Sequence, residues 1–187
     1  MKWLGIVTAL ALALFVGYGI YAQLNKPSVK LRRLPCQQEV TCFERSYAPD
    51  QLQEAVTLLQ QRAYRISVSA QPSVYMKSRL FESVDTADIE RVIAEAIERR
   101  IPQHEGTPAA AEEPLLIQCL IYENDKKDPG KKSKKAFLFE GYLLFSLSLG
   151  EKILYKFQID FMEPKGADIP KRIDCLVQSI LTQHKEH

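Results

Sequence analysis

The sequence predicts a two-layer α+β fold, in which amphipathic helices pack on one face of a mostly antiparallel sheet. Three observations predict it. Some segments repeat apolar residues at helical spacing, others alternate apolar and polar residues, and three of the predicted strands follow one another directly. Consecutive strands favour antiparallel pairing, and amphipathic helices need a sheet face to cover. We assign the α+β domain to residues 50–187, preceded by an N-terminal transmembrane helix or signal segment.

The N-terminal segment is long and uncharged. Residues 3–22 contain no charged side chain. Twenty residues in a helix span about 30 Å, which is enough to cross the hydrocarbon core of a bilayer. A cleaved signal peptide is the alternative, since Lys2 gives a basic start, although twenty apolar residues exceed the usual signal core. Residues 1–22 are therefore a transmembrane anchor or a signal peptide, and residues 3–22 are the expected membrane contact.

Residues 23–49 predict an irregular stalk, because prolines interrupt the segment and no apolar period is sustained. The stalk contains Cys36 and Cys42. Two cysteines so close in sequence favour a small disulfide loop, which persists in oxidising compartments; two unrelated free thiols are the alternative.

The sequence gives conflicting indications about the membrane topology of the chain. The basic residues that follow the apolar segment favour a cytoplasmic bulk by the positive-inside rule. They are Lys26, Lys30, Arg32 and Arg33. The cysteine pair favours export. We expect an extracytoplasmic domain, periplasmic if the organism is bacterial, with export after signal cleavage and a cytoplasm-facing domain as alternatives.

Regular elements are expected from Asp50 onward. Asp50 and Gln53 form a capping box that predicts a helix over 51–62. Alternating residues predict a strand over 64–70, which Pro72 ends or bends. Residues 74–81 have a mixed pattern that suits a second extended stretch.

A second amphipathic helix is expected to begin at Asp85 or Thr86 and to end at Ile101, because Pro102 follows. A polar loop over 102–114 comes next. The last helix should begin near Asp168, with Pro170 in its first turn, where a missing N–H costs little.

Three strands are expected over residues 115–122, 136–149 and 152–161. The first is apolar on both faces, which is typical of a central strand. The last two should form a hairpin. A regular two-residue turn would place lysines opposite core residues, so the register requires a three-residue loop or a bulge that pairs Leu147 with Tyr155 and Phe145 with Phe157.

The small net charge hides an uneven distribution of basic and acidic residues along the chain. Basic residues number 25 and acidic residues 23, for a net charge of +2. One loop is strongly basic and carries Lys126, Lys127, Lys131, Lys132, Lys134 and Lys135. This lysine cluster is either a solvated loop or a patch for an anionic partner, such as phospholipid, an anionic polymer or an acidic protein. Nucleic acid is not expected, because neither arginine nor aromatic residues interleave with the lysines.

Residues for catalysis or metal binding are scarce. His104, His184 and His187 have no ligand-like spacing with cysteines or carboxylates, so no metal, cofactor or catalytic site is expected. Cys119 lies in an apolar strand and Cys175 in a helix. We interpret both as buried structural cysteines, which could pair with each other if strand and helix touch.

These observations favour a membrane-anchored, exported and non-catalytic accessory protein of the cell envelope that acts through a protein partner. At the level of fold, the chain resembles small α+β domains of bacterial envelope accessory proteins, although no motif supports a family. The alternative is a lipid- or polyanion-binding module that uses residues 126–135. An enzyme of unknown class that uses Cys119 is the third hypothesis.

Overall fold

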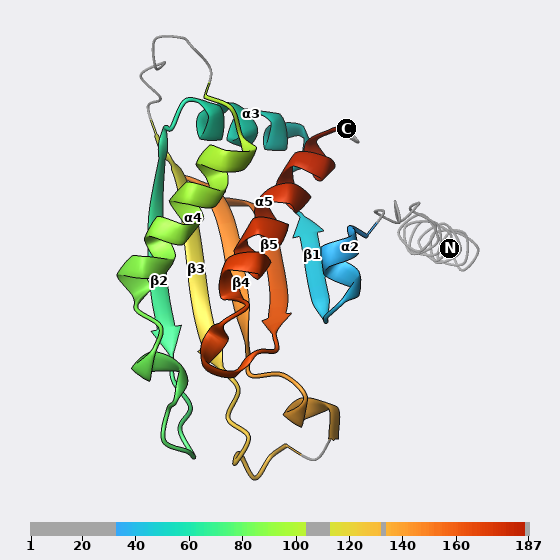
Figure 1. Ribbon diagram of the computed structural model, residues 1–187. Coiled ribbons are helices and arrows are strands. Elements are labelled where there is room, and N and C mark those ends of the chain that lie inside the picture. The colour runs from blue at the N-terminus through green and yellow to red at the C-terminus, as the bar shows by residue number, and fades with distance from the viewer. Residues whose placement is uncertain (1–32, 104–112, 132–133, 186–187) are drawn as a thin grey trace, which may run out of the picture. The chain divides into compact units, whose positions relative to one another are not determined.

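The computed structural model describes residues 33–103, 113–131 and 134–185. They form a five-stranded mixed sheet with helices on one face, which confirms the predicted α+β class (Figure 1). The helices are α2 (Pro35–Gln38), α3 (Pro49–Gln60), α4 (Thr86–Arg100) and α5 (Ile169–Lys185). The strands are β1 (Cys42–Ser46), β2 (Tyr64–Gln71), β3 (Leu115–Glu123), β4 (Gly141–Leu149) and β5 (Lys152–Phe161). Short 3-10 helices cover Leu80–Glu82, Lys134–Phe137 and Pro164–Gly166.

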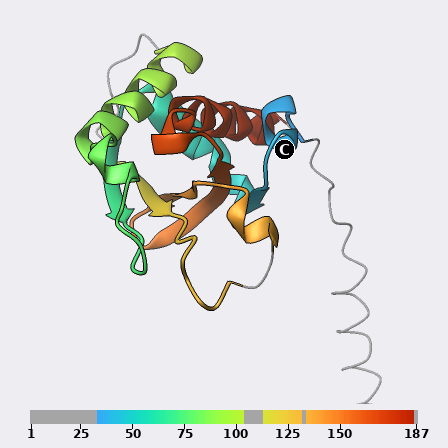
Figure 2. The same ribbon diagram turned by 60° about the horizontal axis from the view of Figure 1, so that its bottom comes forward.

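The sheet has the strand order β1-β5-β4-β3-β2. Three of its four strand pairs are antiparallel, as expected, and β2 pairs with β3 in parallel. The parallel pair follows from α4, which carries the chain from the end of β2 back to the start of β3 and packs on β2. Figure 2 shows the helices gathered on one side of the sheet.

The predicted membrane span, residues 3–22, lies outside the described residues. Within the described ranges, no helix has the length and apolar character to cross a bilayer.

Two elements lie in the segment that was predicted to be a stalk, so that prediction is wrong for residues 35–46. The short helix α2 leads into β1, which pairs with β5 at the edge of the sheet. The pattern of β1 is hidden because one of its core-facing residues is Glu44, which pairs with Phe157. The acidic residue on the inner face and Phe43 on the outer face break the apolar–polar alternation that would have indicated a strand.

Several boundaries differ from the predicted ones. Pro49 opens α3, and Asp50 lies in its first turn rather than at the N-cap. Asp85 does cap α4, since its carboxylate accepts the N–H of Ala87 at 3.0 Å. Residues 74–81 form no strand, and β4 begins at Gly141 because a 3-10 turn occupies Lys134–Phe137.

The β4–β5 hairpin contains the predicted bulge. Phe145 pairs with Phe157 and Leu147 with Tyr155, and the register then shifts, so that Leu149 pairs with Lys152. The extra residue is Leu154, whose side chain is fully buried. Its carbonyl accepts the backbone N–H groups of Tyr47, at 2.8 Å, and Ala48, at 3.3 Å. The bulge therefore also fastens the end of β1.

The sheet leaves no room for a side chain at Gly141. A Cβ there would lie 2.2 Å from the carbonyl oxygen of Tyr122 and 2.3 Å from Cζ of Phe161. We expect Gly141→Ala to lower the free energy of unfolding by about 2–3 kcal/mol, because backbone and a buried ring must shift. Urea unfolding would measure the loss. Gly130→Ala is the control, since its Cβ would contact only the side chain of Asp128; equal losses in both variants would contradict the prediction.

Candidate functional site

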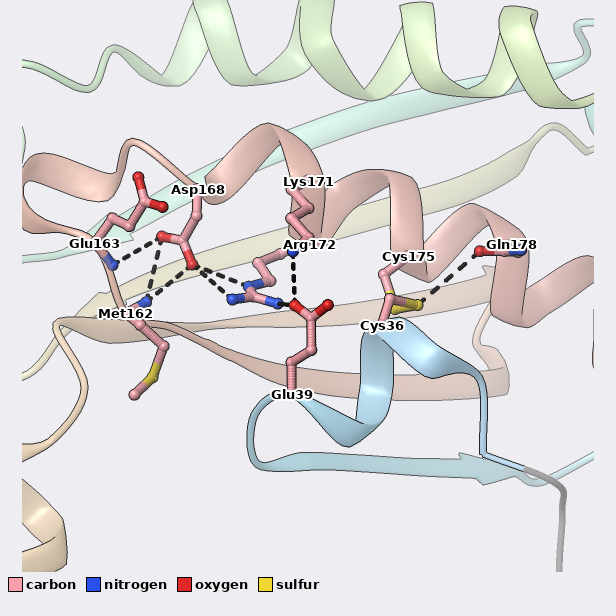
Figure 3. Close-up of polar contacts among 9 residues, drawn as sticks. All are labelled: Cys36, Glu39, Met162, Glu163, Asp168, Lys171, Arg172, Cys175 and Gln178. Atoms are coloured by element: carbon pink, nitrogen blue, oxygen red, sulfur yellow. Dashed lines mark hydrogen bonds and ion pairs between the residues drawn. A yellow bond between two sulfur atoms is a disulfide. The ribbon is translucent and has the colours of Figure 1, made fainter.

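A disulfide joins Cys36 of α2 to Cys175 of α5, with the two Cα atoms 6.0 Å apart and the two residues 139 positions apart in sequence (Figure 3). This corrects the predicted Cys36–Cys42 loop and leaves no place for a Cys119–Cys175 pair. The physical reason is orientation: α2 directs Cys36 towards α5, whereas β1 directs Cys42 into the core. Cys42 is a free thiol, and burial, assisted by the charge of Glu44, raises its pKa to about 12.

A buried ion pair lies beside the disulfide on α5 (Figure 3). Nε of Arg172 donates to Asp168 at 3.0 Å, and both residues are almost fully buried. Asp168 also accepts the backbone N–H groups of Met162 and Glu163, each at 3.0 Å. It thus ties the chain leaving β5 to the start of α5.

Glu39 completes this network from the segment between α2 and β1. Its carboxylate lies 2.6 Å from Nζ of Lys171 and 3.4 Å from Arg172 (Figure 3). The hydrogen bond from Lys171 is the main reason that the pKa of Glu39 is lowered. The disulfide and Glu39 together hold α2 and the start of β1 against α5.

An open groove of about 470 Å³ lies where this segment meets the loop before β4. Its apolar lining includes Phe43, Leu138 and Met162, and its polar lining includes Arg33 and Asp160. Burial raises the pKa of Asp160, while a hydrogen bond from the Thr41 side chain and the charge of Arg172 oppose that rise. These groups suit an apolar ligand surface with a polar rim.

The end of β3 carries two buried carboxylates that organise the loop after β2. Glu123 accepts the N–H groups of Ser73 at 3.0 Å, Arg79 at 3.0 Å and Leu80 at 3.1 Å. Burial alone would raise the pKa of Glu123, but these bonds and one from the Ser78 side chain outweigh it, so the pKa is lowered.

Asp125 holds the tip of the same loop. Its Oδ2 accepts the N–H groups of Val74 at 2.6 Å and Tyr75 at 2.5 Å. Together, Glu123 and Asp125 fix the backbone of the loop after β2 against the loop after β3.

Glu123→Gln should lower the free energy of unfolding by about 2 kcal/mol at pH 7, because a buried carboxylate with three backbone donors loses its charge. The folded pKa is lowered, so this stabilisation is complete above the unfolded pKa of about 4.3 and is lost as the pH falls through the folded value. Urea unfolding between pH 7 and pH 3 should therefore show the deficit shrinking at the acid end. Glu54→Gln, exposed on α3, should stay within about 0.5 kcal/mol throughout. A deficit that is constant with pH would contradict the prediction.

The predicted lysine cluster does not act as one uniform patch. Lys126 forms an ion pair with Glu140 at 2.5 Å. Nζ of Lys131 donates to Oδ1 of Asn124 and to the carbonyl of Asp125, the latter at 2.8 Å.

The other lysines of the cluster differ in position. Lys127 and Lys134 are exposed. Lys135 belongs to the 3-10 helix, and Lys132 lies outside the described residues. Half of the four lysines whose side chains are described therefore stabilise the loop itself.

Cys119 is a poor candidate nucleophile. It is a free thiol in the core-facing row of β3, and burial raises its pKa. Two of the histidines that were considered as metal ligands, His104 and His187, lie outside the described residues. In the part of the chain that the structure describes, no three His, Cys, Asp or Glu side chains are placed to hold a metal ion.

Sequence reasoning missed Asp168, Arg172, Glu123 and Asp125 as organising residues. One signal was available, because Asp168 and Arg172 are four positions apart beside the apolar stripe of the last helix. No comparable signal marks Glu123, whose donors lie 43 to 50 positions away.

Comparison with known proteins assigns no family. No protein-family model matches the chain, and no curated protein matches it. Among solved structures, the chain is similar to a PelC dodecamer from Paraburkholderia phytofirmans, at 10% sequence identity and a TM-score of 0.37. That similarity covers 77% of this chain and 97% of the other.

Proposed function

We propose that this chain is a membrane-anchored, exported and non-catalytic accessory protein of the cell envelope that acts by binding another protein. The apolar segment over residues 3–22 supports the anchor. The Cys36–Cys175 disulfide supports export, because such bonds persist mainly in oxidising compartments. The observation that carries the proposal is the sheet face opposite α3, α4 and α5, which we call the open face.

The open face combines aromatic, aliphatic and basic side chains that are exposed or half-buried. Strand pairing places Phe43, Leu144 and Leu120 in one row, with Gln158 between Phe43 and Leu144; Phe43 is 62% exposed and the two leucines are half-buried. Tyr122 and Tyr142 pair in the adjacent row of the same face and stack, with ring centroids 4.6 Å apart.

The next row of the open face is basic at its β1 end, because Arg45 pairs with Lys156. Aromatic residues and arginine are the side chains enriched at the centres of protein interfaces. A sheet face that carries an exposed aromatic side chain, half-buried aliphatic side chains and basic residues is suited to binding another protein.

Photo-cross-linking in intact cells would test this proposal. A photoreactive phenylalanine analogue placed at Phe43 should yield one discrete adduct with a second protein. The same residue at Glu54, exposed on α3, serves as the control and should yield none. No adduct at Phe43, or the same adducts at both positions, would sink the proposal.

The identified partner would then be tested with purified proteins. Arg45→Glu combined with Lys156→Glu should weaken its binding by at least about tenfold, which corresponds to about 1.4 kcal/mol. Arg91→Glu combined with Arg99→Glu, both exposed on α4, makes the same change of charge on the helical side of the sheet and should leave the affinity unchanged. Equal affinities for all three proteins would place the partner elsewhere on the domain.

Lipid or polyanion binding through residues 126–135 is the second candidate function. The observation that favours it is the pair of exposed lysines, Lys127 and Lys134, close in sequence to the exposed side chains of Phe137 and Leu138. Lys127→Gln combined with Lys134→Gln should reduce binding to anionic vesicles, and unchanged binding would exclude this use of the loop.

A further inference from the structure

Exposed apolar side chains gather at one end of the sheet. We call it the loop end: β2, β3 and β5 end there, and β4 begins there. Figure 1 shows the loops after β2 and β3 projecting from this end. Most of the large apolar side chains that are exposed in the described residues belong to it. They are Val74 (81% exposed), Leu138 (67%), Tyr75 (58%), Phe137 (42%) and Met162 (37%).

The apolar tips are held in place. The N–H groups of Val74 and Tyr75 are bound to Asp125, and the hydroxyl of Ser73 donates to the carbonyl of Met76 at 2.7 Å. Because the buried carboxylate of Asp125 binds the backbone of Val74, the side chain of Val74 is exposed to solvent. The fold therefore presents this apolar tip to the surroundings instead of burying it.

Lysines accompany the tips on the same loops. Lys127, Lys134 and Lys165 are exposed, and no ion pair joins any of them to another described residue. Apolar side chains flanked by free lysines match the interface of an anionic bilayer, where acyl chains accept the apolar groups and headgroups attract the lysines.

The chain also enters the domain close to this end. Arg33 lines the same groove as Leu138 and Met162. Ten residues separate it from Ala22, the last residue of the apolar segment. Ten residues span at most about 35 Å when fully extended. An anchor that ends at Ala22 would therefore limit the distance between Arg33 and the bilayer to about that length.

We propose that the loop end docks on the anionic surface of the bilayer that holds residues 3–22, with Val74 and Leu138 in the interface and the lysines at the headgroups. This inference rests on the anchor of the proposed function. The docked orientation leaves the open face of the sheet available for a protein partner. That face is one side of the sheet, whereas the loop end lies at the ends of the strands.

Fluorescence quenching of the full-length protein in vesicles would test the orientation. Val74→Cys and Leu138→Cys would each carry an environment-sensitive fluorophore, and Glu151→Cys, in the turn at the opposite end of the sheet, is the control. The native cysteines leave these labels specific, because two form the disulfide and two are buried. The vesicles would contain phosphatidylglycerol in phosphatidylcholine, with a spin-labelled lipid as the quencher.

Quenching at positions 74 and 138 should exceed that at 151 by at least about twofold, and Lys127→Gln with Lys134→Gln should reduce the difference. Lys152→Gln combined with Arg65→Gln, both exposed at the opposite end of the sheet, is the matched charge control. Equal quenching at all three positions in protein that floats with the vesicles would overturn the docking but not the anchor. Protein that fails to float would overturn the anchor and with it the proposed function. Tips that lose exposure only when a protein partner is added would assign the loop end to that partner instead.

Discussion

Replacing both Cys36 and Cys175 with alanine should lower the free energy of unfolding by about 3–5 kcal/mol. The bond closes a loop across 139 positions, so its removal returns a large conformational freedom to the unfolded chain. It also removes the covalent link between α2 and α5, which then rely on the buried hydrogen bond from Gln37 to Ser179 and on the ion pairs of Glu39 with Lys171 and Arg172. Urea unfolding of the oxidised wild type and of the double variant would measure the difference.

Two comparisons separate this effect from ordinary core packing. Reduction of the wild type should lower its stability by about the same 3–5 kcal/mol. Cys119→Ala removes a buried thiol without breaking a bond and should cost only about 1 kcal/mol. A double variant as stable as the oxidised wild type would mean that the disulfide does not constrain the unfolded chain.

The second large effect is expected at Arg172. Arg172→Met should destabilise the domain by about 3–5 kcal/mol, because it leaves the buried carboxylate of Asp168 without its cation. Lys171→Met is the control on the next residue of α5. The ion pair of Lys171 with Glu39 is largely exposed, and its loss should cost less than about 1 kcal/mol.

A double-mutant cycle would show whether the two buried residues act together. Asp168→Asn alone should also destabilise, since Arg172 then lacks its buried partner. Combined with Arg172→Met, it should cost clearly less than the sum of the two single changes, measured by urea unfolding at pH 7. Additive losses would show that Asp168 stabilises the domain only through the N–H groups of Met162 and Glu163.

The sequence contains enough local information to predict most of the elements. Strand β5 has the expected bounds, Lys152–Phe161, because its apolar alternation is regular. Helix α4 and the β4–β5 bulge follow equally from local patterns, since capping, period and parity act within a few residues. Expectation and structure diverge where the local pattern is polar, as at Glu44 in β1.

The organisation of the candidate surfaces depends on contacts that no local pattern records. Glu44 accepts hydrogen bonds from Gln37, at 2.6 Å, and from Ser179, at 2.5 Å, and the latter lies 135 positions away. The disulfide is another such contact. It joins Cys36 to Cys175 across 139 positions, whereas the close spacing of Cys36 and Cys42 predicts a short loop. For Lys126 and Lys131 the sequence predicts an exposed patch for a partner, but both side chains bind groups within the fold. A count of charges cannot tell which lysines make such contacts.

The Cys36–Cys175 bond also determines how mechanical load passes through the domain. A pull on the N-terminal segment reaches Cys36 before it reaches β1, and the sulfur bridge transmits it to α5. All five strands therefore lie within the covalent ring that the disulfide closes between Cys36 and Cys175. Tension from a membrane tether would be borne by a covalent bond and by the buried side of α5, and the hydrogen bonds that hold β1 to β5 would not be peeled apart in sequence.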